Sequence, residues 1–487
     1  MKIRAGLLRK SIALFLTAGI TLLSLSGCQY ESFDDYLEAL GIKNPDYDDS
    51  NVQDLNDADD AQPEETYSLE DETQNVSEPF ESDDTVTITS DEEALFLDES
   101  TTDAGALEDD DTSSQALASN SSFTKEDIDA RAAVGLTDDQ IPALKQKQSG
   151  RYYYERLTDS GKLLYVELLA IMENLGENIC ISTTNDKAVE LVFDYLMADH
   201  PEIFYVDGYQ YTNYTLGDTV TKMSFTGNYI YDANEIARRQ TLINEEVNRC
   251  LANAPSSDDD YYLVKYIYEY LILNTEYDIN APDNQNICSV FMYGKSVCNG
   301  YAKAAQYLFD RMGLECTFVT GTVRTKSGSS ERHAWNLVLC NDAYYYVDAT
   351  WGDASYQSVS GESADASKLP AVNYDYLNVT TRDLTRTHAI SDDVTMPMCA
   401  SMADNYYVRE GEYFTSPELS LVKDLFDRRY KDGSKNVTIK CADSNVYRAL
   451  FDELITQRKV FDYLQGEDTS TVSYTTFEDT GTIMFWL

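Results

Sequence analysis

Apolar residues recur at every third or fourth position in several stretches of the chain, and this spacing is typical of amphipathic helices. It predicts helices at residues 160–174, 186–198, 234–252, 258–273, 416–430 and 444–458. Alternating apolar and polar residues predict strands at 178–182, 209–214, 222–231, 315–323, 333–340, 343–351, 436–441, 472–477 and 482–487, and a hairpin at 406–414. Together the two patterns predict an α+β fold.

Residues 294–313 read as a loop that opens into a helix, because apolar residues recur at helical spacing from Tyr301 onward. Ser296 is the expected N-cap and Gly313 the expected stop. These limits place Cys298 in the first turn, where unpaired backbone N–H groups and the positive end of the helix dipole favour an anion. A thiol there is biased toward thiolate, the nucleophilic form. The alternative is a buried cysteine that only packs.

Two predicted strands, 333–340 and 343–351, meet at Asn341-Asp342, a dipeptide that favours a tight hairpin turn. A turn centred between these two residues makes His333 and Asp348 diagonal neighbours on one face of the hairpin. Backbone positions related in this way lie about 7–8 Å apart, so the two side chains can share a hydrogen bond. A shift of register by one residue would place them on opposite faces.

The first 27 residues have the pattern of an export signal, with basic residues before an apolar run at 11–25. The run ends in Leu25-Ser26-Gly27-Cys28, which resembles the lipobox of bacterial lipoproteins. The resemblance implies that the signal is removed before Cys28 and that Cys28 carries a lipid on the extracytoplasmic face of a bacterial cell membrane. The alternative is an ordinary signal peptide. No later apolar run is long enough to span a membrane, so lipid is the expected anchor.

The segment after Cys28 is strongly acidic. Residues 31–120 contain 30 Asp and Glu residues against one basic residue, Lys43, within a chain whose net charge is −48. Such a segment cannot bury enough apolar surface to offset its ordering entropy, so residues 28–122 are expected to be a disordered tether. The negative charge also argues against nucleic acid as a partner.

The nine cysteines include no CxxC pair and no Cys/His zinc spacing, so we predict neither a structural metal nor a cofactor. If Cys28 is lipidated and Cys298 is a free thiol, seven cysteines remain. That number is odd, so at least one more is unpaired. The sequence leaves the disulfide pattern open.

Three motifs together resemble the transglutaminase-like family. They are Gly-Lys-Ser-Val-Cys-Asn-Gly-Tyr-Ala at 294–302, His-Ala-Trp-Asn at 333–336 and Tyr-Tyr-Val-Asp-Ala-Thr-Trp-Gly-Asp at 345–353. The resemblance covers about residues 258–355 and implies a papain-like core that performs acyl transfer. It makes Cys298 the nucleophile, His333 the base and Asp348 the acid that orients the base.

One departure from the family concerns tryptophan. Members that cross-link proteins have a tryptophan upstream of the cysteine that helps to hold the oxyanion, whereas the tryptophans of this chain are Trp335, Trp351 and Trp486, all downstream. The departure favours a peptidase or amidase over a cross-linking enzyme. Trp335, Trp351 and Tyr277 are the candidate residues of the substrate cleft, and the alternative for the two tryptophans is that they only fill the core.

Other candidates have weaker signals. His200 precedes a proline at a helix end and is expected to be structural, and His388 stands in a polar stretch without a partner motif. Asp353 is expected to be exposed, and the alternative is that it caps or braces the loop. The 37 tyrosines are expected to be core and rim residues rather than a glycan-binding surface.

The expected division of the chain is a signal peptide (1–27), the acidic tether (28–122), an α+β accessory region (123–254), the transglutaminase-like core (255–398) and a C-terminal α+β region (399–487). Residues 436–454 weakly echo 178–196. The expected function is hydrolysis or acyl transfer on a protein or peptide substrate, with cell-wall peptide as one candidate. The alternatives are protein cross-linking and a non-catalytic scaffold that binds cell wall or protein.

Overall fold

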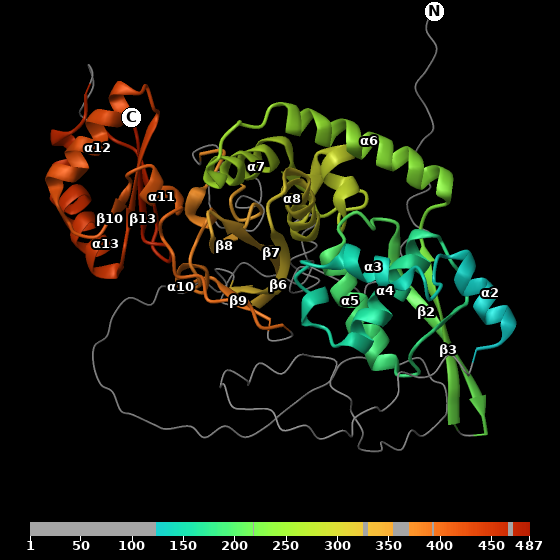
Figure 1. The fold of residues 1–487 in the computed structure, drawn as a ribbon. Helices are drawn as coiled ribbons and strands as arrows, with labels where there is room; N and C mark the ends of the chain where they lie inside the picture. Colours follow the sequence, from blue (N-terminus) through green and yellow to red (C-terminus); the bar gives the residue numbers. More distant parts are fainter. Residues whose placement is uncertain (1–122, 218, 325–329, 354–369, 392–393, 466–470) are drawn as a thin grey trace, which may run out of the picture. The chain divides into compact units, whose positions relative to one another are not determined.

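The computed structural model describes residues 123–487 except 218, 325–329, 354–369, 392–393 and 466–470 (Figure 1). The expected signal peptide, the lipidated Cys28 and the acidic tether therefore lie outside the described residues. Within the described ranges, no helix combines the length and the apolar character that crossing a membrane requires.

The N-terminal part of the described chain is a small antiparallel sheet with helices. Strand order is β1-β3-β2, and helices α4 and α5 begin at side-chain caps, Thr158 and Asn185. Helix α5 ends at Asp199, just before Pro201, as the sequence predicts. The elements are α2 (Lys125–Ala133), α3 (Ile141–Gln148), η2 (Tyr154–Arg156), α4 (Asp159–Glu173), β1 (Ile179–Ile181), α5 (Asp186–Asp199), β2 (Val206–Leu216), β3 (Thr219–Tyr229) and α6 (Ala233–Ala252).

The central part is a four-stranded antiparallel sheet, in the order β8-β7-β6-β9, with helix α8 packed against β6 and β7 (Figure 1). A short parallel pair, β4 with β5, leads into α8. The elements are α7 (Asp260–Asn274), β4 (Glu276–Tyr277), η3 (Ser289–Tyr293), β5 (Lys295–Ser296), α8 (Cys298–Met312), β6 (Cys316–Arg324), β7 (Ser330–Cys340), β8 (Ala343–Val347), η5 (Tyr374–Tyr376), α10 (Thr381–Leu384) and β9 (His388–Ile390).

The β7–β8 hairpin has the predicted register, since Cys340 pairs with Ala343 and Asn336 with Val347. Strand β8 is shorter than predicted. It ends at Val347 because the side chain of Asp348 accepts hydrogen bonds from the backbone of Thr350 and Trp351, and these bonds turn the chain.

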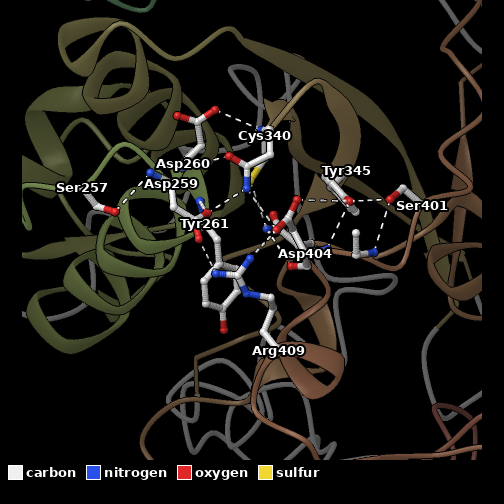
Figure 2. A network of polar contacts seen from close by, with 12 residues as sticks. Ser257, Asp259, Asp260, Tyr261, Cys340, Tyr345, Ser401, Asp404 and Arg409 are labelled. Carbon is white, nitrogen blue, oxygen red and sulfur yellow. Dashed lines mark hydrogen bonds and ion pairs between the residues drawn. The ribbon is translucent and has the colours of Figure 1, made fainter.

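The turn of this hairpin is held by a polar network, which Figure 2 shows in detail. Asn341 adopts a left-handed conformation, and its amide group donates hydrogen bonds to Asp259 at 2.8 Å and to Asp404 at 3.0 Å. Arg409 bonds the same two carboxylates, at 2.5 Å and 2.9 Å. The network joins the start of α7, the hairpin turn and the segment around Asp404, so the hairpin is fixed at its turn as well as along its strands.

The C-terminal part is a second four-stranded sheet, in the order β10-β11-β13-β12, with α12 and α13 packed on β11. Its core is apolar and includes Val422, Phe426, Val437, Ile439, Leu450 and Phe485. The elements are α11 (Tyr406–Arg409), β10 (Tyr413–Phe414), α12 (Leu419–Lys431), β11 (Asn436–Cys441), α13 (Ser444–Phe451), η6 (Asp452–Thr456), η7 (Lys459–Asp462), β12 (Tyr474–Phe477) and β13 (Thr482–Trp486).

The hairpin predicted at 406–414 is wrong. Residues 406–409 form a turn of helix, which Asn405 caps by accepting a hydrogen bond from the backbone N–H of Tyr407. Strand β10 pairs in parallel with β11, a strand more than 20 residues away in the sequence. The local alternation was therefore overridden by a cap and by a long-range pairing. The α+β class itself is confirmed.

Candidate active site

Cys298 is the first residue of α8, as the sequence predicts, but the cap differs. Val297 is the N-cap residue and its side chain makes no capping bond. Ser296, the expected cap, lies in β5, where its hydroxyl bonds Ser289 at 2.6 Å and the carbonyl of Asn284 at 3.1 Å. The first-turn N–H groups of α8 are thus left without a side-chain cap, the arrangement that favours a negative charge.

Gly300 allows the start of α8 to lie close to the segment that precedes it. A Cβ atom at position 300 would lie 1.9 Å from the hydroxyl oxygen of Ser296 and 2.8 Å from that of Ser289. Any side chain there would push the helix away from the segment that precedes it. The glycine of the Cys-Asn-Gly-Tyr motif therefore has a steric role beside the cysteine.

The side chain of Cys298 is fully buried. The other cysteines of the described ranges are free thiols. The thiolate expected from the sequence requires Cys298 to be a free thiol.

His333 and Asp348 are brought together as predicted. Nε2 of His333 lies 2.7 Å from Oδ2 of Asp348, and both side chains are buried. Helix α8 is tied to the same strand, because the amide of Asn336 donates to the carbonyl of Ala302 at 2.9 Å. The strand that carries His333 and the helix that begins at Cys298 are thus joined one helical turn beyond the cysteine.

The carboxylate of Asp348 has four hydrogen-bond donors around it. Oδ1 accepts from the backbone N–H groups of Thr350 and Trp351, at 2.9 and 3.1 Å, and Oδ2 faces His333 and a second histidine, His388. Burial alone raises the pKa of this carboxyl. The charge of His333 and the hydrogen bonds from the two histidines outweigh burial and hold the pKa of Asp348 well below its usual range.

His388 is the site residue that the sequence analysis missed. Its Nε2 lies 3.0 Å from Oδ2 of Asp348, and its ring centre is 5.5 Å from that of His333. It stands on β9, which pairs with β6 forty residues after Asp348 in the sequence. The residues next to His388 form no motif that would mark it as a site residue. The pairing of β9 with β6 brings it to Asp348.

The expected cleft residues lie around His333 and in the segment before Cys298. Trp335 stacks on His333 with ring centres 5.9 Å apart, and Trp351 meets the same ring edge-on at 6.2 Å. Tyr277 is buried and pairs with Ser296 in the segment before Cys298. Asp353 is buried rather than exposed, because Tyr301 of α8 donates a hydrogen bond of 2.6 Å to it, so the prediction of exposure is wrong.

His200 behaves as the structural residue that the sequence predicts. It is buried at the end of α5, and its ring nitrogens bond Glu202 at 2.7 Å and Gln148 at 3.1 Å. Both ring nitrogens of His200 therefore have hydrogen-bond partners within the accessory region.

A cavity of about 1090 Å³ opens beside His333. Its lining includes His333, Asn299, which follows Cys298, and residues of α5 and β6 such as Tyr195 and Phe318. Trp335, Trp351 and Tyr277 are not in its lining, so their role in a cleft stays a prediction. The accessory region supplies one wall of this cavity and the core supplies the others.

Lys303 is the charged residue of α8 in this cavity. Its ammonium lies 5.8 Å from the ring centre of Phe318, and burial lowers the pKa of Lys303 to about 8. Among the described residues no carboxylate forms an ion pair with it. Burial disfavours the charged form of Lys303, yet the residue lies beside the candidate active site. Lys303 is therefore a candidate residue for contact with substrate.

The ligand atoms of His333, Asp348 and His388 lie within 4.8 Å of one another, a spacing that a metal ion could use. The hydrogen bonds explain the same spacing, because both imidazole nitrogens face one carboxylate oxygen. We therefore treat the three residues as a hydrogen-bonded group and not as metal ligands.

Residues 251–349 match the family described as the Transglutaminase-like superfamily. The match contains Cys298, His333 and Asp348 and ends before Trp351 and His388. The chain therefore contains a transglutaminase-like domain, as the three motifs implied. The candidate active site lies in this domain.

Particular relatives are more distant. The human Kyphoscoliosis peptidase is 28% identical over 120 residues, which are 21% of this chain and 17% of that protein. A TGase structure shares 17% identity at a TM-score of 0.21 and covers 29% of this chain and 45% of its own. The periplasmic domain of TgpA from Pseudomonas aeruginosa, bound to ethylmercury, shares 13% at 0.18 and covers 30% and 66%. The chain spans less than two thirds of each of these proteins.

Proposed function

We propose that the protein is a cysteine enzyme that transfers or hydrolyses acyl groups at peptide or amide bonds through Cys298, His333 and Asp348. The observation that carries the proposal is the buried 2.7 Å contact between His333 and Asp348 on a hairpin tied to the helix that begins at Cys298. A nucleophile, a base and a group that orients the base are the three parts that thiol acyl transfer needs.

The first half of the reaction starts from reduced Cys298. Asp348 engages Nε2 of His333, so Nδ1 is the ring atom that takes the thiol proton. The thiolate attacks the carbonyl carbon of the amide bond and forms a carbon–sulfur bond. The first-turn N–H groups of α8 stabilise the negative oxygen of the tetrahedral intermediate. The carbon–nitrogen bond then breaks, and the leaving amine takes its proton from His333.

The second half releases the acyl group. His333 removes a proton from an incoming water or amine, which attacks the thioester carbonyl and expels the Cys298 thiolate. Water as acceptor makes the enzyme a hydrolase, and a protein amine makes it a cross-linking enzyme. The acceptor is therefore the one variable between the two activities.

The test compares reduced wild-type protein with Cys298→Ala, using a peptide library and cell-wall fragments followed by mass spectrometry. Cys250→Ala is the matched control, because Cys250 is a fully buried free thiol on α6. We expect Cys298→Ala to abolish turnover and Cys250→Ala to retain it. We expect Asp348→Asn to lower kcat/KM by about 10²- to 10⁴-fold, the range seen when the orienting acid of a triad is lost.

Equal turnover by wild type and Cys298→Ala would reject the proposal and leave a scaffold that binds cell wall or protein. Adding a primary amine to the same assay separates the acceptors. Mass gain by the amine identifies transfer, and mass gain by water identifies hydrolysis.

We further propose that the enzyme is held at the extracytoplasmic face of a bacterial membrane by lipid on Cys28, with residues 28–122 as a tether. The lipobox-like end of the apolar run supports this proposal. Metabolic labelling with a fatty-acid analogue tests it. Label that persists in Cys28→Ala would contradict it.

A further inference from the structure

The carboxylate oxygen that orients His333 serves two histidines. Oδ2 of Asp348 lies 2.7 Å from Nε2 of His333 and 3.0 Å from Nε2 of His388. A triad needs only the first of these contacts. The second histidine is 3% exposed and lies outside the stretch that matches the family.

The sheet is built so that His388 can reach this oxygen. Gly321 of β6 pairs with His333 on one side and with Ile390 of β9 on the other, and Val323 pairs with His388. Directly paired residues of antiparallel strands point to the same face, so both histidines stand on one face, on either side of β6. The residue of β6 that pairs with His333 is a glycine, and a Cβ there would lie 2.6 Å from the ring of Trp335 and 2.1 Å from the carbonyl oxygen of Ala389.

The contacts of His388 define its tautomer. An ionised carboxylate accepts hydrogen bonds only, so Nε2 of His388 carries a proton toward Asp348. Its Nδ1 lies 2.8 Å from the hydroxyl of Thr387, which can donate to it. Burial lowers the pKa of His388, and so does the nearby charge of His333, while the contact with Asp348 opposes them. The balance favours a neutral ring with its proton on Nε2.

The surroundings hold this ring still. Its centre lies 5.0 Å from that of Trp335, 4.9 Å from that of Trp351 and 5.6 Å from that of Tyr376. Among the described residues, the titratable groups that contact His388 through a hydrogen bond or a ring are Asp348, His333 and Tyr376. The ring is therefore a fixed neutral donor beside the carboxylate.

We propose that His388 is a positioning residue of this enzyme, whose Nε2–H holds Asp348 in place and withdraws part of the negative charge that the carboxylate would otherwise direct at His333. The proposal rests on the function proposed above. Without this donor, Asp348 is a stronger acceptor and binds the His333 imidazolium more tightly. The imidazolium then loses its proton at a higher pH.

The main test is the pH dependence of Cys298 alkylation by iodoacetamide in the reduced protein, read at that cysteine by mass spectrometry. A thiolate–imidazolium pair gives a plateau whose alkaline end reports deprotonation of His333. We expect His388→Phe to move this alkaline end upward by about half a pH unit or more. We expect His388→Gln, which keeps an N–H donor near the same place, to stay close to wild type. His200→Gln is the control, because His200 is buried away from the site.

Each outcome has one meaning. A wild-type protein without the plateau lacks the ion pair, and the proposed function then fails. A wild-type plateau with equal alkaline ends in wild type and His388→Phe overturns the role of His388. So does an equal shift in His388→Phe and His388→Gln, because packing alone would then explain it.

A measurement on the wild-type protein tests the proposal even if the His388 variants do not fold. The chain has three histidines, so ¹⁵N-histidine labelling gives three ring systems, and His200→Gln assigns one of them. We expect His388 to be a neutral ring protonated at Nε2 at pH 8, and to gain its second proton only below the pH at which an ordinary histidine does. A neutral ring protonated at Nδ1, or an imidazolium at pH 8, would overturn the proposal.

Discussion

The ammonium of Lys440 lies 2.7 Å from Oδ1 of Asp375, and both side chains are buried. Lys440 belongs to β11 of the C-terminal sheet, whereas Asp375 belongs to η5, which lies between β8 and β9 in the sequence. The hydroxyls of Thr480 and Thr482 donate to the same carboxylate, at 2.6 and 2.7 Å. This ion pair therefore links the C-terminal sheet to the segment that accepts the backbone N–H of Asp348 through Tyr376.

Lys440→Met is expected to destabilise the protein by about 3–5 kcal/mol, because it leaves the carboxylate of Asp375 buried without its counter-charge. Chemical denaturation at neutral pH measures the effect. Lys459→Met is the matched control, since its ion pair with Glu453 lies near the surface and is expected to contribute about 1 kcal/mol or less. Equal losses of stability in the two variants would show that the Lys440–Asp375 ion pair stabilises the protein no more than the Lys459–Glu453 pair does.

Gly321→Ala is expected to separate β9 from β6, because the new methyl group would meet the carbonyl of Ala389 at 2.1 Å. We expect a loss of about 2–3 kcal/mol in stability and a fall in any turnover that depends on the site. Gly208→Ala in β2 is the control, since its nearest neighbour would be the amide of Asn228 at 3.2 Å. A fully active and fully stable Gly321→Ala would contradict the close approach of the two strands.

Lys303→Met is expected to stabilise the protein at pH 7 by about 1–2 kcal/mol, because the charged lysine is kept partly buried without an ion-pair partner among the described residues. The sign follows from the pKa of Lys303, which burial lowers to about 8. The unfolded chain binds the proton more tightly, so the cost is full below pH 8 and disappears as pH rises toward 10.5.

The measurement for this prediction is the free energy of unfolding at pH 7 and pH 10 for wild type, Lys303→Met and Lys187→Met. Lys187 lines the same cavity but is exposed, so its variant is expected to match wild type at both pH values. A Lys303→Met protein that is less stable than wild type at pH 7 would show that the lysine is a stabilising residue.

Local pattern alone located most of the elements and the predicted catalytic residues. Helical spacing placed Cys298 at the start of α8, and the Asn341-Asp342 turn set the register that brings His333 to Asp348. Both are short-range features, in which a few adjacent residues determine the backbone path. The shortened β8 escaped prediction because the side chain of Asp348 captures backbone N–H groups that alternation does not reveal.

What only the tertiary structure decided is which distant segments meet. His388 reaches Asp348 because β9 pairs with β6 over a glycine, and β10 pairs in parallel with β11 in place of folding back as a hairpin. Ser296 bonds Ser289 in place of capping the helix. In each case the deciding free energy comes from burial and hydrogen bonding between segments that are not neighbours in sequence. The sequence by itself determined the three triad candidates and their order, and the tertiary structure decided what surrounds and orients them.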